Sequence, residues 1–284
     1  MKETFDYARF KRLMLICLRY LVLIFTSLLA LFPFVWVAFS GFKSNQEIYM
    51  NSFGLPKVWK IENYIKALTS TSLATGFKNS LFVTSLVLLL TVIAGSMISY
   101  AIAFLYDSRL KEKVYLYFTS GIMIPMTAVL IPMFMLLKQL GLLNTLWGLI
   151  LVYTASQTAT TVFVLTGFMR GIPNELIEAA IIDGCSNWQS FWRIIMPLAK
   201  PGIATVFTLS FIYCWNEYLL SNVIAGSGDL RTIIVAVYMT KMEMNIDYGL
   251  LCANLMISML PVIVFYCLFQ EQVVKGMTSG AVKN

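Results

Sequence analysis

The chain contains several apolar stretches, each long enough to cross a lipid bilayer as an α-helix. A helix needs about 20 consecutive, mostly apolar residues to cross a bilayer core about 30 Å thick. We predict six such spans, at residues 13–39, 77–105, 114–137, 147–169, 202–224 and 247–270. Charged residues make up 12% of the 284 residues, about half their share in soluble domains. The sequence therefore predicts an all-α integral membrane protein with six transmembrane helices.

The distribution of positive charge predicts how these spans are oriented. Lysine and arginine are concentrated in the cytoplasmic loops of membrane proteins. Most of the 21 basic residues fall on the side of the N-terminus, which explains the net charge of +7 without a nucleic-acid partner. We expect a cytoplasmic N-terminus at 1–12, a transmembrane domain at 13–270 and a cytoplasmic tail at 271–284. The opposite orientation is the alternative.

Several kinds of chemistry have no residues to support them in this sequence. The chain has no histidine, so catalysis by imidazole and metal sites with histidine ligands are excluded. Its five cysteines form no CxxC pair, and we expect free thiols. Neither GxxxxGK[ST] nor GxGxxG occurs, so the chain lacks both common phosphate-binding loops. We predict no metal or cofactor in the chain, and any energy for active work must come from elsewhere.

A polar segment at 170–201 separates the fourth and fifth spans and has the pattern of a helical hairpin. Pro173 suits the first turn of a helix, and Gly184 can take the left-handed conformation that ends one. Ser186 and Gln189 have the spacing of a capping box, which starts a second helix. Helically spaced apolar residues follow and two prolines then end that helix: Trp188, Phe191, Trp192, Ile195, Pro197 and Pro201. With the N-terminus inside, this hairpin lies in the cytoplasm.

The hairpin carries a motif that resembles the EAA signature of ABC importer permeases. Its parts are Glu178-Ala179-Ala180, Gly184 and Ile194-Ile195-Met196-Pro197, at the spacing of that signature. Met196 replaces the usual leucine and conserves volume. Two further segments, Trp215 to Tyr218 and Val274 to Lys283, resemble the carbohydrate-uptake branch, in particular permeases similar to the maltose permease G subunit.

This resemblance implies the type I ABC importer permease fold and a coupling role for the loop at 170–201. The ATPase-coupling residues would be Glu178, Ala179, Ala180, Asp183, Gly184 and Pro197. The tail would contact the ATPase through Gln270, Lys275 and Gly276. The alternatives are an amphipathic hairpin on the inner leaflet and a disordered polar tail.

By the same resemblance, the chain would import a di- or oligosaccharide across the bacterial cell membrane by alternating access, without being an enzyme. Its partners would be a second, different permease in a heterodimer, two ATPase subunits that bind ATP and magnesium, and an extracytoplasmic solute-binding protein. Two alternatives remain open: a permease for another solute such as a polyol or glycerol phosphate, and an ion-driven secondary transporter.

Polar residues within the spans are candidates for the substrate path. They are Gln157, Thr158, Trp215, Asn216 and Glu217. Lipid offers no hydrogen bonds, so such groups need partners in the protein, water or substrate. Sugar hydroxyls suit them, but so do bonds between helices. For Glu217, the one acid well inside a span, the alternatives are contact with substrate and a structural role at an outer gate or subunit interface.

Three prolines within the spans and one segment on the predicted outer side give two further predictions. Pro125 and Pro132 in the third span and Pro261 in the sixth predict kinks or breaks. Residues 57–68 show apolar residues at helical spacing, which predicts an amphipathic helix on the outer surface. Such a helix would rest on lipid headgroups or dock a partner outside the membrane.

Overall fold

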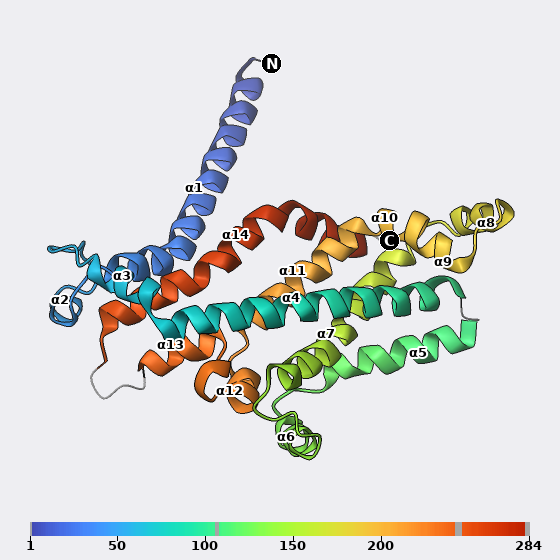
Figure 1. The fold of residues 1–284 in the computed structure, drawn as a ribbon. Helices are drawn as coiled ribbons and strands as arrows, with labels where there is room; N and C mark the ends of the chain where they lie inside the picture. The colour runs from blue at the N-terminus through green and yellow to red at the C-terminus, as the bar shows by residue number, and fades with distance from the viewer. Residues whose placement is uncertain (1, 106–107, 242–245, 282–284) are drawn as a thin grey trace. The chain divides into compact units, whose positions relative to one another are not determined.

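The computed structural model describes residues 2–105, 108–241 and 246–281, with side chains described over 11–105, 109–241 and 246–271. Every regular element in these ranges is a helix (Figure 1). The elements are α1 (Lys2–Ser40), α2 (Asn45–Met50), α3 (Glu62–Thr69), α4 (Thr71–Tyr100), η1 (Ala101–Leu105), α5 (Ser108–Ser120), η2 (Gly121–Met123), α6 (Leu130–Gln139), α7 (Leu146–Met169), α8 (Glu175–Ile182), α9 (Asn187–Ser190), η3 (Phe191–Ile195), α10 (Met196–Leu198), α11 (Lys200–Asn216), α12 (Leu219–Ala225), η4 (Gly228–Leu230), α13 (Ile233–Lys241) and α14 (Tyr248–Ala281).

Four described helices are long and apolar enough to cross a membrane: Lys11–Ser40, Thr71–Leu105, Leu146–Met169 and Tyr248–Glu271. They match the first, second, fourth and sixth predicted spans. The pair Asn187–Leu198 and Lys200–Asn216, bent by 76°, brings the number to five if it counts as one span. An all-helical membrane fold is therefore confirmed, whereas a count of six is not.

The third and fifth predicted spans are not continuous helices. Within 114–137, α5 ends at Ser120 and α6 begins at Leu130, with η2 and turns between them. Pro125 lies in this break, as its missing N–H predicted. Within 202–224, α11 ends at Asn216 and α12 begins at Leu219. Pro261, in contrast, lies inside the unbroken helix α14.

The contacts divide the chain into two units, which we describe separately. Unit 1 comprises Met1–Leu68 and Glu243–Ile257, and unit 2 comprises Thr69–Met242 and Ser258–Asn284.

In unit 2, α4 packs against α7 along a line of small and hydroxylated residues. The buried members of this line are Thr84, Thr91, Gly95, Ser96 and Ser99. Large apolar residues of α4 are exposed: Leu81, Phe82, Leu89, Leu90, Ile93 and Met97. A β-carbon at Gly95 would overlap the side chain of Thr161 on α7. Small residues thus bring the two helices close, as is common in membrane proteins, and leave the bulky ones for lipid.

Aromatic rings join α11 to the part of α14 that belongs to unit 2. Phe211 and Phe265 stack with ring centroids 3.9 Å apart and an interplanar angle of 5°. Trp215 stacks on Phe211, and its indole N–H donates a 3.0 Å hydrogen bond to the carbonyl oxygen of Ser258. These contacts fix the C-terminal half of α11, which precedes the break at Glu217.

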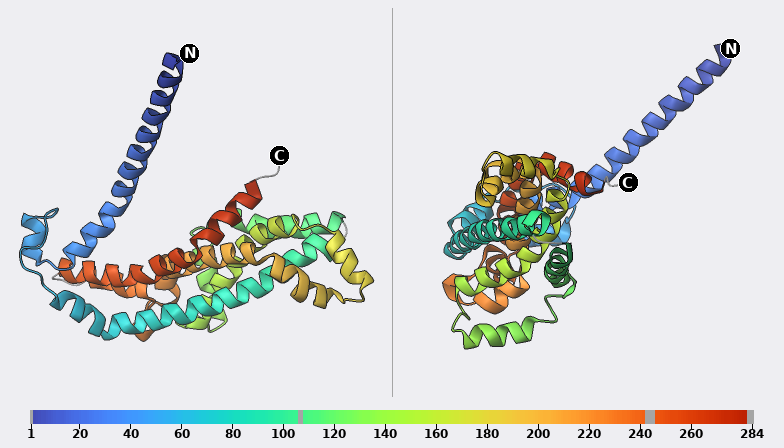
Figure 2. Two further views of the ribbon diagram at one scale, coloured as in Figure 1. Left: turned by 90° about the horizontal axis from the view of Figure 1, so that it is seen from above. Right: turned by 90° about the vertical axis from the view of Figure 1, so that its right-hand side faces the viewer.

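In unit 1, side chains of α3 hold the turn that follows α1. The Tyr64 hydroxyl donates a 2.8 Å hydrogen bond to the carbonyl oxygen of Ala38, and burial raises the pKa of Tyr64 to about 12. Gly249 of α14 comes so close that a β-carbon there would overlap the Lys43 carbonyl oxygen. Along its apolar part α1 is unburied, and Figure 2 shows it projecting away from α2 and α3.

The amphipathic helix predicted at 57–68 is shorter than expected, and it packs on the rest of unit 1 through the side opposite to most of its apolar residues. It begins at Glu62, so residues 57–60 are not helical. Asn63 and Ala67 are its buried residues, whereas apolar residues that defined the predicted face are exposed: Ile61, Ile65 and Leu68. The hydrogen bonds of Asn63 to carbonyl groups hold this polar residue on the packed side, and the apolar residues stay exposed for lipid or a partner, as predicted.

Candidate functional site

The polar segment between α7 and α11 forms a helical hairpin whose turn is built from local hydrogen bonds. Gly184 has φ of +81°, which confirms the predicted left-handed conformation. The N–H of Cys185 bonds to Ala180 O at 2.9 Å, and that of Gly184 bonds to Ile181 O at 3.0 Å. This pair of bonds is a Schellman motif, and it satisfies carbonyl groups at the end of α8. The helix itself begins at Glu175, two residues after Pro173.

The second helix of the hairpin begins with the predicted capping box. The Gln189 N–H donates to Ser186 Oγ at 3.3 Å, and the Ser186 N–H donates to Gln189 Oε1 at 2.9 Å. Each such cap stabilises a helix by about 0.5–2 kcal/mol. The chain therefore reverses direction between Asp183 and Ser186 in a fixed geometry.

Pro197 does not end this helix, contrary to the prediction. The helix continues from Asn187 to Leu198 and passes through the π-helical turn η3. The N–H of Met196 bonds to Phe191 O, five residues back. Pro197 has no N–H, and its ring would clash with the carbonyl four residues back in a regular α-helix. The wider π turn accommodates it, and the chain bends by 76° only at Ala199.

A buried cluster attaches the hairpin to the ends of α4, α7 and α11. Its buried members are Tyr100, Met169, Ile177, Phe191, Ile195 and Ala199. In addition, the Tyr100 hydroxyl donates a 3.2 Å hydrogen bond to Asn187 O. On α7, Arg170 pairs with Glu112 of α5 at 2.8 Å and lies over the ring of Tyr115. The base of the hairpin is therefore packed against these helices.

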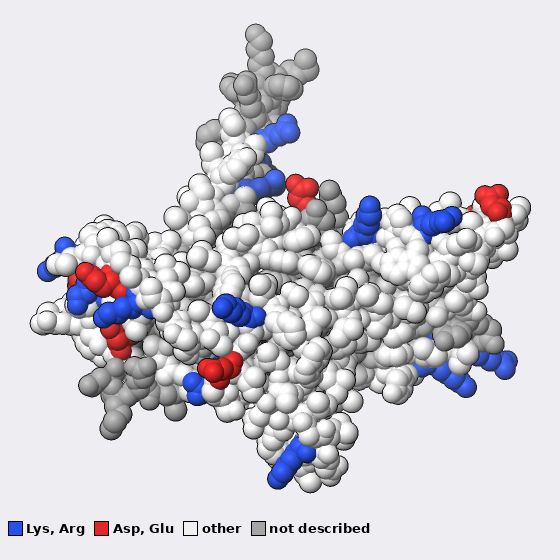
Figure 3. All heavy atoms as spheres, viewed as in Figure 1, with Lys and Arg blue, Asp and Glu red and all other residues white. Residues whose placement is uncertain are grey.

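The outward side of the hairpin is apolar and acidic, without covering contacts in the described chain. Its exposed large apolar residues are Leu176, Ile181, Ile182, Trp188 and Trp192, and Ile182 is 84% exposed. Glu178, Asp183 and Gly184 are exposed beside them. In Figure 3, charged residues appear near the end of unit 2 that carries α8, while much of the surface in view is uncharged. Such an exposed apolar patch with a polar rim is typical of a protein-binding surface.

Two of the coupling residues predicted from the sequence do not lie on the exposed turn of the hairpin. Ala180 is buried, so it packs inside the hairpin and cannot contact a partner. Pro197 is exposed, but it lies in α10, directly after the π turn, and not at the turn around Gly184. The apolar residues Ile181 and Ile182 were not predicted as coupling residues, although they directly follow Glu178-Ala179-Ala180 in the sequence.

Glu217 lies at the break between α11 and α12, and its carboxylate is fully engaged. Oε2 accepts hydrogen bonds from the Tyr153 hydroxyl at 2.7 Å and from the Ser221 N–H at 3.0 Å. Oε1 accepts one from the Leu220 N–H at 2.9 Å. The backbone at Glu217 is extended, with ψ of 117°. Glu217 therefore caps α12 and joins it to α7, where Tyr153 is buried.

The other polar residues of the predicted substrate path differ in their surroundings. Trp215 is buried and its N–H is bonded, so its ring does not face an open path. Asn216 is exposed and donates to Ile212 O at 2.9 Å, which leaves its amide oxygen available. Gln157 is buried, and Thr158 bonds to Thr154 O on the same helix. Along α7, three hydroxyl oxygens are shielded and have no partner among the described residues: Thr154, Thr161 and Thr166.

The predicted tail contacts lie at the end of α14. The helix continues through Lys275 and Gly276 to Ala281. Gln270 belongs to the same helix, and the side chains beyond Glu271 are outside the described part of the chain.

The described residues thus form an all-helical membrane protein with an exposed helical hairpin between two apolar helices. Comparison with known families agrees: residues 92–279 match the model of the binding-protein-dependent transport system inner membrane component. The chain belongs to this family. The family resemblance and the prediction that the chain is not an enzyme are thereby confirmed, and the ion-driven secondary transporter is excluded.

Curated relatives match nearly the whole chain. The diacetylchitobiose uptake system permease protein NgcG of Streptomyces coelicolor is 34% identical over 261 residues, which cover 91% of this chain and 86% of the relative. The probable starch degradation products transport system permease protein AmyC of Thermoanaerobacterium thermosulfurigenes is also 34% identical, covering 91% and 93%.

A solved structure supports the fold. A chain from the crystal structure of a bacterial ABC transporter involved in import of the acidic polysaccharide alginate matches with a TM-score of 0.80 at 22% identity. The match covers 91% of this chain and 96% of that chain. At this identity the likeness concerns the fold alone.

Proposed function

We propose that this chain is one permease subunit of an ATP-driven importer for a di- or oligosaccharide. Several relatives are named for the uptake of oligosaccharides or starch degradation products. A strongly anionic solute would favour basic residues inside the spans, and residues 81–105, 146–169 and 248–270 contain no lysine or arginine. The observation that best supports this proposal is the packed hairpin, because its exposed apolar side needs a partner.

The hairpin would act as the coupling element between this chain and an ATPase subunit. The ATPase would hold ATP and magnesium, since this chain has neither common phosphate-binding loop. Closure of two ATPase subunits would push on Ile182 and its neighbours, and the buried cluster around Phe191 would pass this movement to α7 and α11. Protein interiors are close-packed and have low compressibility, so a displacement on one side of the cluster is transmitted to the other. The transporter would thereby alternate between outward-facing and inward-facing states.

The complete assembly would contain a second, different permease and an extracytoplasmic solute-binding protein. In this chain α5 and α6 together would form the third of six spans in the type I arrangement, α8 to α10 would supply the hairpin, and α11 and α12 would supply the fifth span. Both termini would face the cytoplasm, so that the tail at 271–284 reaches the ATPases through Gln270, Lys275 and Gly276. Sugar would pass near Gln157, Thr158 and Asn216, with Glu217 and Trp215 shaping the path.

The test is reconstitution with all partners, followed by ATP-driven sugar uptake in proteoliposomes. Ile182→Ser removes the most exposed apolar side chain of the hairpin and no buried contact. We expect it to reduce both ATPase co-purification and uptake by about tenfold, the effect of losing one central apolar contact. The chain should still melt at the wild-type temperature.

Val58→Ser is the matched control, because Val58 is 67% exposed in the outer segment. It should leave ATPase co-purification unchanged. A coupling role for the hairpin would be wrong if the Ile182 and Val58 variants behaved alike. Glycerol 3-phosphate and a polyol, offered in the same uptake assay, test the alternative solutes.

A further inference from the structure

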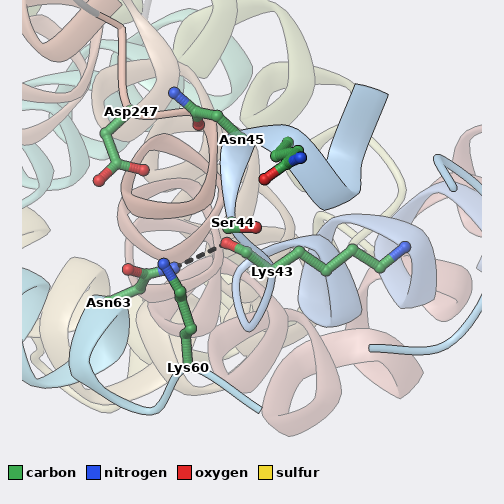
Figure 4. Close-up of a pocket in the computed structure, with 7 residues that line it drawn as sticks. Lys43, Ser44, Asn45, Lys60, Asn63 and Asp247 are labelled. Carbon is green, nitrogen blue, oxygen red and sulfur yellow. Dashed lines mark hydrogen bonds between the residues drawn. The ribbon is translucent and has the colours of Figure 1, made fainter. Parts of the chain in front are cut away.

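A polar cavity of about 530 Å³ lies within unit 1, and none of its residues belongs to the hairpin or to the proposed path. It is lined by Lys43, Ser44, Asn45, Gln46, Lys60, Asn63 and Asp247 (Figure 4). They come from the turn after α1, the start of α2, the region of α3 and the residue before α14. Sites for small ligands commonly enclose about 300–1,000 Å³, so this cavity has the size of one.

Hydrogen bonds hold the walls of the cavity in place. Asn63 Nδ2 donates to Gly41 O at 3.0 Å and to Lys43 O at 3.1 Å, the second of which Figure 4 shows as a dashed line. Asn45 Nδ2 donates to Ile246 O at 2.7 Å, and Asn45 Oδ1 accepts from the Tyr248 N–H at 2.8 Å. The two chain segments of unit 1 are thus tied together around the cavity. A ligand would find its site formed and would spend little binding energy on ordering it.

Three side chains keep polar atoms available to the cavity. Asn63 is only 5% exposed, and because both of its amide hydrogens are used, its Oδ1 is left without a partner in the described chain. Asp247 accepts one hydrogen bond, from the Leu250 N–H. Lys60 is exposed, and its ammonium has no partner among the described residues. An amide oxygen that faces an open polar cavity can accept a hydrogen bond from a bound donor in place of water.

The cavity lining offers one positive and one negative charge, and both donors and acceptors of hydrogen bonds. Lys60 contributes a cation and Asp247 an anion to the cavity. The ammonium of Lys43 does not, because it donates to the carbonyl oxygens of Asn51 and Ser52 and its side chain leads away in Figure 4. A phosphate would meet the carboxylate of Asp247, and a small cation would meet Lys60. A neutral ligand that both donates and accepts hydrogen bonds suits all three groups.

We infer that this cavity is a carbohydrate subsite, in which sugar hydroxyl groups donate to Asp247 and to Asn63 Oδ1 and accept from Lys60. The inference rests on the proposed function, because it places the substrate class of the importer at a second position in this subunit. By the proposed topology the subsite lies on the outer side of the membrane, where sugar arrives. It would hold sugar before transfer to the path near Gln157.

Protection of Lys60 from acylation tests the subsite in the reconstituted complex, without the binding protein. The probes are maltotriose and N,N′-diacetylchitobiose, with mannitol at equal osmolality as the solvent control. Mass spectrometry reports acylation of Lys60 and, as an internal control, of Lys57, which is exposed outside the cavity. At a sugar concentration about ten times the dissociation constant, Lys60 should react about tenfold more slowly and Lys57 at an unchanged rate.

Asp247→Asn provides the matched variant, because asparagine still caps the start of α14 but lacks the charge. It should raise the sugar concentration needed for protection about tenfold, as expected when a hydrogen bond loses its charged acceptor. The subsite is refuted if neither sugar protects Lys60, or if Lys57 is protected equally. Protection of Lys60 by the sugar-free binding protein would also refute it, since the cavity would then dock a protein.

The same complex, once supplied with the binding protein, is assayed for ATP-driven uptake, so the two proposals can fail separately. Uptake without protection of Lys60 overturns the subsite alone. Protection without ATP-driven uptake of any sugar overturns the proposed function and leaves the subsite standing.

Discussion

Glu217 illustrates how a single side chain can serve the architecture of a transport path. Its carboxylate accepts three hydrogen bonds, from Tyr153 and from the backbone of Leu220 and Ser221. An acid inside a membrane span is costly unless such partners compensate it. These three hydrogen bonds give Glu217 a structural role at the break between α11 and α12.

Replacing Glu217 should accordingly affect stability. Glu217→Ala removes the cap of α12 and leaves the buried Tyr153 hydroxyl unpaired, which should cost about 2–4 kcal/mol. Glu217→Gln keeps an acceptor and should cost about 1 kcal/mol. Thermal unfolding of the purified chain in detergent measures the order of these losses.

Asn216→Ala is the control, because Asn216 is exposed and bonds only to its own helix. It should change the midpoint of unfolding little. If Glu217→Ala melted like Asn216→Ala, the capping role would be refuted. A Glu217 variant that kept wild-type stability but changed the KM for sugar uptake would instead support direct contact between Glu217 and the substrate.

Among the helices, the sequence predicted those features that depend on nearby residues. The left-handed Gly184 and the capping box at Ser186 were correct, because their hydrogen bonds join residues no more than five positions apart. The break near Pro125 was also correct in kind. In contrast, the contact of Tyr153 with Glu217 joins residues 64 positions apart. A single sequence contains no record of such pairs, so that part of the site could not be predicted.

From the packing of α4 on α7 we predict that alanine destabilises the chain at Gly95 and stabilises it at Gly167. Gly95→Ala would force a methyl group into the side chain of Thr161, and overpacking of this kind costs about 1–3 kcal/mol. Gly167 on α7 has no atoms near the position of a β-carbon. Gly167→Ala should therefore stabilise the chain by about 0.5–1 kcal/mol, since alanine favours helix. Thermal unfolding in detergent measures both shifts.

The variant Thr161→Ser removes the methyl group that Gly95→Ala would meet. Combined with Gly95→Ala, it should recover part of the lost stability, because the remaining overlap is smaller. Equal destabilisation by Gly95→Ala with and without Thr161→Ser would contradict the close packing of α4 on α7.

At the scale of the whole chain, the number of crossings depends on one interrupted element. The four long helices α1, α4, α7 and α14, together with the bent pair that ends in α11, give at most five spans among the described residues. A sixth requires that α5 and α6, separated by a break of turns, cross the membrane together. Hydropathy read this stretch as one span because it averages over the break. The side on which the hairpin lies depends on this crossing.

Cysteine labelling decides both the crossing and the orientation. Cys185 follows the hairpin turn and is partly exposed, whereas Cys214 and Cys252 are buried. In a chain with Cys17→Ala and Cys267→Ala, Val58→Cys adds a reporter in the outer segment. A membrane-impermeant maleimide applied to spheroplasts should label position 58 and not Cys185, and inside-out vesicles should show the reverse. Labelling of both from one side would mean that α5 and α6 do not cross, because only α4 and α7 would then separate the two positions. Labelling of Cys185 alone in spheroplasts would reverse the orientation and move the hairpin away from any cytoplasmic ATPase.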